Sequence, residues 1–262
     1  MSRFGRIRSS VRAAALAFLR RRTAVFFTFL FPAIIVVIFG ALIGTQPTGG
    51  GLFTEPPGYY VPGYLAVVVL FTPLSRVGSE VARHREGNRF EKLATTPLRR
   101  WEWLLAQTIV NVGVIGLAAL LLLGLLVALT GAEIYLSPLL IPFVVVGVAL
   151  FCGIGTVIGS LADSQDGVIA ASNAIALPLL FLSETFVPPE LLPEWFRPLM
   201  DLSPLTYFSR GVRAATYDSH ELVDGTVLAS FGGEDPLVNL AILTGLALVA
   251  VIVGALSLPR TD

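Results

Sequence analysis

The apolar residues of this 262-residue chain lie in long runs, and the short segments between the runs hold most of the charged residues. A helix needs roughly 20 mostly apolar residues to cross the hydrocarbon core of a bilayer. Windows of that length predict six membrane spans, at residues 24–44, 59–77, 104–130, 138–160, 168–187 and 237–258. The pattern therefore predicts an all-α membrane protein with six transmembrane helices.

The second and fifth spans are the least regular. The second contains Pro62 and Pro73 and has Arg76 near its end, so it is a marginal crossing that requires the arginine to reach the interface. The fifth is interrupted by Pro178, which bundled membrane helices tolerate. Both spans are kept in the prediction.

A basic stretch, residues 1–22, precedes the first span. Its apolar residues recur at helical spacing with arginines between them, which predicts an amphipathic helix on the membrane surface with its arginines near anionic headgroups. A disordered basic tail is the alternative. The apolar positions are Phe4, Ile7, Val11, Ala14 and Phe18. The first apolar run is about twenty residues long and lacks a clear small-x-small cleavage site, so we expect a retained helix.

Composition agrees with a membrane protein. Hydrophobic residues make up 55% of the chain and charged residues 14%, whereas a soluble domain carries about a quarter charged residues. The mean hydropathy is +0.79. The one cysteine, Cys152, excludes an intramolecular disulfide, and with two histidines it does not supply the ligands of a zinc site.

The basic residues predict the orientation of the chain. Seven arginines precede the first span, and seven basic residues lie between Arg76 and Arg100, while the loops after the first and third spans contain no Lys or Arg. The positive-inside rule then places the N-terminus, the loop 78–102 and the C-terminus in the cytoplasm. The acidic segment 188–236 is expected outside. We therefore expect a multi-pass protein of the cell membrane.

Chemistry within the chain is limited. The only lysine, Lys92, follows Glu91, so there is no phosphate-binding Gly-Lys-Ser/Thr loop, and any ATPase would be another chain. His84 and His220 fall in loops predicted on opposite sides of the membrane, which argues against a Ser–His pair in the bundle. No catalytic, metal-binding or cofactor-binding residue is predicted. An ATP-independent channel or carrier and an intramembrane enzyme stay as alternatives.

The loop 78–102 contains a short element of its own. Residues 89–94 can form a turn or two of helix with Phe90 and Leu93 on one side, and Thr96-Pro97 ends it because proline disfavours helix in the residue before it. Trp101 and Trp103 are typical of re-entry at the membrane interface. A short helix in a basic loop is typical of an exposed docking element. The alternative is a charged loop that only sets the topology of the chain.

Two stretches resemble the permeases of ABC-2-type transporters of the daunorubicin and multidrug resistance kind. The loop contributes Arg85-Glu86-Gly87, Phe90-Glu91-Lys92-Leu93 and Thr95-Thr96-Pro97-Leu98. The segment before the last span contributes Leu179-Leu180-Phe181-Leu182-Ser183, Pro188-Pro189, Leu192-Pro193-Glu194-Trp195, Ser203-Pro204-Leu205-Thr206-Tyr207 and Arg213. Two positions depart from the pattern, because many relatives have a small residue at Glu184 and Gly-Thr at Gly87-Asn88.

The resemblance implies a single permease domain over residues 1–262, which exports a substrate as a dimer of permease chains. Each chain would pair with a cytosolic ATPase that binds ATP and Mg, so this chain would hold no cofactor. The ATPase-coupling loop would use Arg85, Glu86, Gly87, Phe90, Glu91, Leu93, Thr96 and Pro97. A re-entrant helical hairpin before the last span would close the outer exit, with the gate residues Pro193, Trp195, Pro204, Leu205 and Tyr207. A peripheral amphipathic loop is the alternative to the hairpin.

Small and polar residues within the spans suggest packing. Gly40-x-x-x-Gly44 and Gly155-x-x-x-Gly159 permit close helix contact, which we expect within one subunit. Gln107, Asn111 and Asn173 could line a substrate path or form interhelical hydrogen bonds, so no substrate-binding residue is assigned. The substrate, and whether the second permease chain is identical, stay open.

Overall fold

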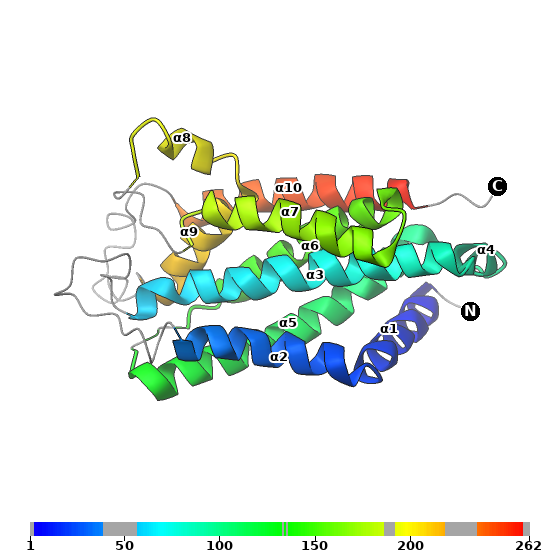
Figure 1. Ribbon diagram of the computed structural model, residues 1–262, viewed down its shortest axis with the longest axis horizontal. Coiled ribbons are helices and arrows are strands. Elements are labelled where there is room, and N and C mark those ends of the chain that lie inside the picture. The colour runs from blue at the N-terminus through cyan, green and yellow to red at the C-terminus, as the bar shows by residue number, and fades with distance from the viewer. Residues whose placement is uncertain are drawn as a thin grey trace.

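The computed structural model describes residues 3–38, 57–132, 134, 136–185, 192–217 and 235–258. These residues form helices and connecting turns, and no strand occurs among them (Figure 1). The helices, in chain order, are α1 (Arg3–Leu19), α2 (Arg22–Val36), the 3-10 turn η2 (Pro57–Tyr60), α3 (Val61–Glu86), α4 (Arg89–Ala94), α5 (Arg100–Thr130), α6 (Leu140–Leu161), α7 (Gln165–Phe181), α8 (Arg197–Met200), α9 (Pro204–Thr216) and α10 (Pro236–Ser257).

Within this part of the chain, four helical segments are long and apolar enough to cross a membrane. They are Pro57–Glu86, which joins η2 to α3, and the helices α5, α6 and α10. The last three agree with the predicted spans to within a few residues. The helices α2 and α7 are apolar but shorter, at 15 and 17 residues. The end of the predicted first span, 39–44, lies outside the described residues, and α7 ends at Phe181, before the predicted end at 187.

The helix α3 is neither marginal nor short, so that part of the prediction is wrong. It continues nine residues beyond the predicted end at residue 77, to Glu86, and its apolar residues are almost all buried. Pro62 lies in the first turn, where the missing N–H costs no helical hydrogen bond. The Arg76 side chain is directed at α5, where its Nη1 donates a hydrogen bond of 3.0 Å to Asn111 Oδ1.

Glycines bring α3, α6 and α10 close together. A Cβ placed on Gly155 would lie 2.5 Å from the carbonyl oxygen of Leu74, and one on Gly78 would lie 2.8 Å from Gly155 O. On the other side of α6, a Cβ on Gly254 would lie 2.7 Å from Gly153 O of α6. Such contacts leave no room for a side chain, so the glycine pair of α6 packs within one subunit, as predicted. The pair Gly40 and Gly44 lies outside the described residues.

The two ends of the bundle differ (Figure 1). The start of α1, the helix α4 and the last turn of α10 lie at one end, whereas α8 and α9 lie at the other. Arg100 Nη1 donates a 2.9 Å hydrogen bond to Leu258 O, which ties the start of α5 to the end of α10.

The N-terminal stretch is a helix, as predicted, and it turns away from the bundle axis at its junction with α2 (Figure 1). It packs against α5, and Phe18 at its end is buried, while Phe4 at its start is exposed. The predicted apolar face of α1 is therefore in part directed at the protein itself.

Candidate functional site

The connection between α3 and α5, residues 87–99, is called here the α4 loop. Asn88, immediately before α4, has φ +49°, and it is the one non-glycine residue of the described chain with a positive φ. Asparagine tolerates this left-handed conformation better than most residues, whereas Gly87 has an ordinary φ of −93°. At the other end of α4, the N–H and Oγ1 of Thr96 donate to Leu93 O at 3.0 and 2.6 Å. Both ends of this six-residue helix are thus fixed.

One side of α4 faces the protein. The rings of Phe90, His84 and Trp103 form a cluster whose centroids are 5.3 to 5.6 Å apart. Phe90 and Leu93 are half-buried against the main core. Because His84 belongs to α3 and Trp103 to α5, the Phe90 ring contacts both helices that flank the loop.

The other side of α4 is polar and exposed. Arg89, Glu91 and Lys92 are all exposed, as is Glu86 at the end of α3. The surface that α4 presents outward is therefore a mixed row of acidic and basic groups.

Two adjacent residues at the end of α3 reach the connection between α6 and α7. Arg85 Nη1 donates to Ala162 O at 2.9 Å and to Gly159 O at 3.3 Å, so a cation caps the last carbonyl groups of α6. Glu86 accepts hydrogen bonds from the N–H of Gln165 at 3.3 Å and from its Nε2 at 3.2 Å, at the start of α7. The base of the α4 loop is thereby linked to two further helices.

Helix α1 is held at the same end of the bundle. Arg6 Nε and Nη2 donate to the two carboxylate oxygens of Glu102 at 3.2 and 2.8 Å, and the Glu102 side chain is fully buried. Glu102 Oε2 also accepts from the N–H of Arg99 at 2.9 Å, which caps α5. The hydrogen bond with Glu102 raises the pKa of the Arg6 guanidinium above its ordinary value.

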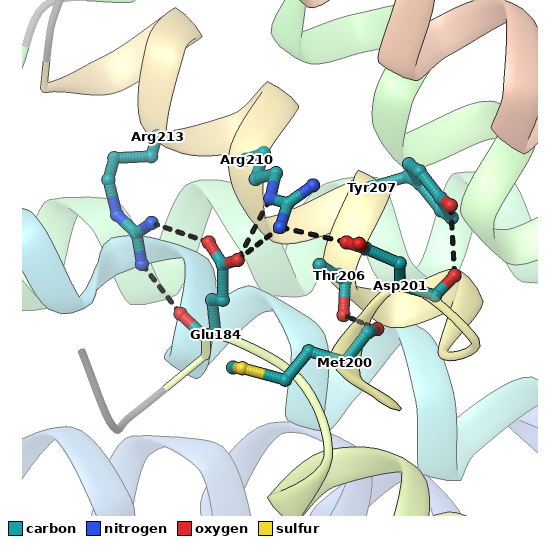
Figure 2. A network of polar contacts seen from close by, with 7 residues as sticks. All are labelled: Glu184, Met200, Asp201, Thr206, Tyr207, Arg210 and Arg213. Atoms are coloured by element: carbon teal, nitrogen blue, oxygen red, sulfur yellow. Dashed lines mark hydrogen bonds and ion pairs between the residues drawn. The ribbon is translucent and has the colours of Figure 1, made fainter. Parts of the chain in front are cut away.

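A second polar network lies at the opposite end, where α7 ends beside α9 (Figure 2). Glu184 is 5% exposed, and its Oε1 accepts hydrogen bonds from Nε and Nη2 of Arg210, the first at 2.9 Å. Arg213 Nη2 donates to the Glu184 carbonyl oxygen at 2.6 Å, and its guanidinium carbon lies 4.2 Å from the centre of the Tyr59 ring. Glu184, through its carboxylate and its carbonyl group, therefore joins the end of α7 to two turns of α9.

The turn between α8 and α9 belongs to the same network. Arg210 Nη2 lies 3.0 Å from Asp201 Oδ1, and Tyr207 Oη donates to Asp201 O at 2.8 Å (Figure 2). Thr206 Oγ1 donates to Met200 O at 2.6 Å. Helix α9 begins at Pro204, and its apolar side, which includes the fully buried Leu205 and Phe208, faces the bundle.

Comparison with known proteins assigns the chain to a family. Residues 6–217 match the family described as ABC-2 type transporter. This range contains the α4 loop and the Glu184 network, and it ends before α10. The chain belongs to the ABC-2 type transporter family. Its family and its permease relatives identify it as a membrane subunit of a transporter, and its long apolar helices agree with this.

Several relatives are permeases. The daunorubicin resistance ABC transporter permease protein DrrB1 of Streptomyces coeruleorubidus is 27% identical over 206 residues, which cover 75% of this chain and 67% of that protein. The inner membrane transport permease YhhJ of Escherichia coli is 29% identical over 163 residues, covering 59% of this chain and 42% of YhhJ. The probable multidrug ABC transporter permease YbhR of Escherichia coli is 24% identical over 155 residues, covering 58% of this chain and 41% of YbhR.

In this ABC-2 protein, the residues predicted for the coupling loop lie together at one end of the bundle, but they have different surroundings. Glu86, Gly87, Glu91, Thr96 and Pro97 are exposed. Phe90 and Leu93 are half-buried, and their side chains pack against the protein's own core. Arg85 is occupied with the end of α6.

The residues predicted for the outer gate of the ABC-2 protein do not form one group. Leu205 is buried and Tyr207 contacts Asp201, whereas Pro193 and Trp195 are exposed before α8, with Trp195 at 72%. The prolines 188 and 189 lie outside the described residues. The sequence reasoning missed Arg210, although its spacing of three from Arg213 places both on one side of a helix.

Proposed function

We propose that the chain is the permease subunit of an ABC exporter, which moves its substrate outward while a separate cytosolic ATPase subunit binds Mg and hydrolyses ATP. The observation that carries this proposal is the form of the α4 loop. It is a short helix with an exposed polar side for a partner, and its inner side is attached to helices α3 and α5. A loop that only sets topology needs neither feature.

The coupling follows from these contacts. The ATPase binds the exposed groups of α4, and closure of the ATPase dimer displaces the loop. The Phe90 ring transmits the displacement to α3 and α5, and Arg85 and Glu86 transmit it to the ends of α6 and α7. The bundle then shifts between two conformations, because the ATP-bound partner has a higher affinity for one of them.

In this proposal α2 and α7 complete six crossings of the cell membrane. The arginines before α2 and around α4 support a cytoplasmic position for α1, the α4 loop and the end of α10. Two permease chains, identical or different, form the transport unit, and each carries one ATPase.

The helices α8 and α9 act as a re-entrant hairpin that closes the outer exit. Helix α9 has 13 residues, about 20 Å in length, which is too short to cross a bilayer. Its start is stabilised by the hydrogen bonds of Thr206 to Met200 O and of Tyr207 to Asp201 O, so two carbonyl groups at the break between α8 and α9 have partners within the protein. Of the residues expected in this gate, Pro204, Leu205 and Tyr207 lie in α9, whereas Pro193 and Trp195 lie on the exposed stretch before α8.

Charge reversal on α4 tests the coupling. The pair Glu91→Arg and Lys92→Glu inverts the exposed charges of α4 without touching the Phe90 cluster. In proteoliposomes to which the separately purified ATPase is added, we expect this variant to lose substrate-stimulated ATP hydrolysis and export. The matched control, Glu194→Arg, reverses an exposed charge at the opposite end and should retain both activities.

A larger change supplements the charge reversal. Replacement of residues 86–93 by a Gly/Ser linker should abolish coupled hydrolysis while the ATPase alone keeps its basal rate. Unchanged coupling in both α4 variants would rule out this role for the loop. Because one relative is named for daunorubicin resistance, daunorubicin is the first compound to test in the export assay.

A further inference from the structure

An excess of positive charge lies where the α1–α2 junction meets α3. Three arginines, Arg21, Arg76 and Arg83, surround one carboxylate, Glu80, and this group is called here the Arg76 cluster. Glu80 Oε2 lies 3.2 Å from Arg21 Nη2 and 2.7 Å from Arg83 Nη2. His84 Nδ1 lies 3.5 Å from Glu80 Oε1. Glu80 therefore pairs with two of the three guanidinium groups, those of Arg21 and Arg83.

Arg76 is the least compensated of the three. It precedes Glu80 by one helical turn, and in the described part of the chain no carboxylate oxygen lies within 4.0 Å of its guanidinium nitrogens. Its contacts are a hydrogen bond to the neutral, fully buried Asn111 and the Phe18 ring, whose centre is 4.3 Å from the guanidinium carbon. In addition, Arg83 Nε is buried without a hydrogen-bond partner. A cation beside an apolar bundle is costly unless an anion accompanies it.

An apolar groove begins close to this cluster. It has a volume of about 240 Å³ and lies between α2 and α5, lined by Phe29, Pro32, Ala33, Ala118, Leu121, Leu122 and Leu125. Ala118 follows Asn111 by seven residues, so it lies on the same side of α5, about 10 Å along the helix. On α2 the groove begins with Phe29, eight residues after Arg21. The groove therefore lies on the same side of α5 as the Asn111 contact of Arg76, about two helical turns further along, and its lining is apolar.

We propose that this junction binds an anionic phospholipid, with its phosphate group at the Arg76 cluster and an acyl chain in the α2–α5 groove. Guanidinium groups bind phosphate oxygens through paired N–H donors, and the cluster has more such donors than Glu80 can accept. The groove offers no charged side chain, which suits a hydrocarbon chain. The lipid belongs to the leaflet on the α4 side, which is the inner leaflet in the orientation proposed above. The binding itself does not depend on the ATPase.

A lipid titration of the purified full-length chain tests this site. The chain is kept in a neutral detergent, and its melting temperature is followed as long-chain phosphatidylglycerol, phosphatidylcholine or sodium phosphate is added. We expect a saturable increase with phosphatidylglycerol and none with phosphatidylcholine. Sodium phosphate at the same concentration should have no effect, because it lacks the acyl chain.

Variants locate the two parts of the site. Arg76→Gln should weaken phosphatidylglycerol binding about tenfold, because one charge-assisted contact is lost. Arg21→Gln, at a more exposed position, should do the same and serves if the first variant does not fold. Ala33→Trp fills the groove and should also weaken binding. The matched control, Arg12→Gln, removes the same charge from the exposed side of α1 and should bind normally.

Three results would overturn the site. If Arg12→Gln weakens binding as much as Arg76→Gln, the lipid is attracted only by the general surface charge. If both Arg76→Gln and Arg21→Gln bind normally, the cluster is not the phosphate site. If sodium phosphate or phosphatidylcholine equals phosphatidylglycerol, an anionic lipid is not the ligand. The lipid titration contains no ATPase. Its failure would therefore not contradict the coupling role proposed for α4, which a separate assay tests.

Discussion

Arg6 of α1 and Glu102 of α5 are joined by two parallel hydrogen bonds, of 3.2 and 2.8 Å, although 96 positions separate them in the sequence. The same carboxylate caps the start of α5 through the N–H of Arg99. A single buried side chain thus fixes both the helix that follows the α4 loop and the N-terminal helix that lies beside it.

Loss of this ion pair should release α1. In Arg6→Ala the helix keeps its other contacts with α5 but loses its charged anchor, so trypsin should cleave after the exposed Arg8 and Arg12 faster than in the unmodified chain. The rate of appearance of the shortened chain on a gel measures this. Glu91→Ala, which removes an exposed carboxylate on α4, serves as the control and should leave the rate unchanged. Equal rates in all three proteins would show that α1 is held by apolar contacts alone.

The Phe90 ring should be needed for coupling but not for docking. Phe90→Ala removes the contact with His84 and Trp103 and should cost about 2 kcal/mol of stability, because the ring is half-buried. We expect the variant to co-purify with the ATPase and to show reduced substrate-stimulated hydrolysis. The charge-reversed α4 variant should instead lose the ATPase during purification. If Phe90→Ala also loses the ATPase, the ring takes part in docking.

Alanine substitutions at glycines should lower the melting temperature only where the glycine lies in close contact with another helix. Gly155→Ala places a methyl group against the Leu74 carbonyl of α3 and should destabilise the protein by about 1–3 kcal/mol. Gly124→Ala is the matched control, since a Cβ there meets no atom within 4 Å. This second change should be neutral or raise the melting temperature, because alanine favours helix. Equal melting temperatures for the two variants would contradict the α3–α6 packing.

The buried carboxylate of Glu184 should contribute more to the free energy of unfolding than an exposed carboxylate does. Glu184→Ala removes the carboxylate that Arg210 and Arg213 share, while Arg210 keeps its contact with Asp201. We expect a cost of about 2 kcal/mol, which is reduced because the Arg210 side chain is 23% exposed. The double variant Glu184→Ala/Arg210→Ala should lose less than the sum of the single changes. Thermal unfolding of the four proteins measures the coupling. Glu194→Ala, an exposed carboxylate at the same end, should have no effect, and additivity would contradict the pairing.

Local patterns predicted much of this fold. The bounds of α4 follow from residues 89–94 and from the stop at Thr96-Pro97, and the apolar runs give α5, α6 and α10. The prediction failed for the end of α3, because several of the charged residues that indicated a loop make contacts within the folded protein. Glu80 pairs with Arg83 on its own helix and with Arg21, which is 59 positions away. Sequence spacing shows the first contact but not the second.

The sites were less predictable than the helices. Spacing placed Phe90 and Leu93 on one side of a short helix, but it could not show whether that side faces a partner or the protein. Glu184 was visible only as a departure from a family pattern. Its role depends on Arg210, 26 residues later, and that contact exists only when α9 is folded against the end of α7.

The neighbouring side chains of Arg85 and Glu86 have a mechanical consequence. Arg85 holds the last turn of α6 and Glu86 holds the first turn of α7, while Gly78 and Gly155 keep α3 and α6 in backbone contact. These contacts oppose sliding of α3 past its neighbours, so under the proposed coupling we expect α3, α6 and α7 to move together as one stiff unit. Any bending would then fall on joints elsewhere in the chain, such as Gly131, whose left-handed backbone ends α5.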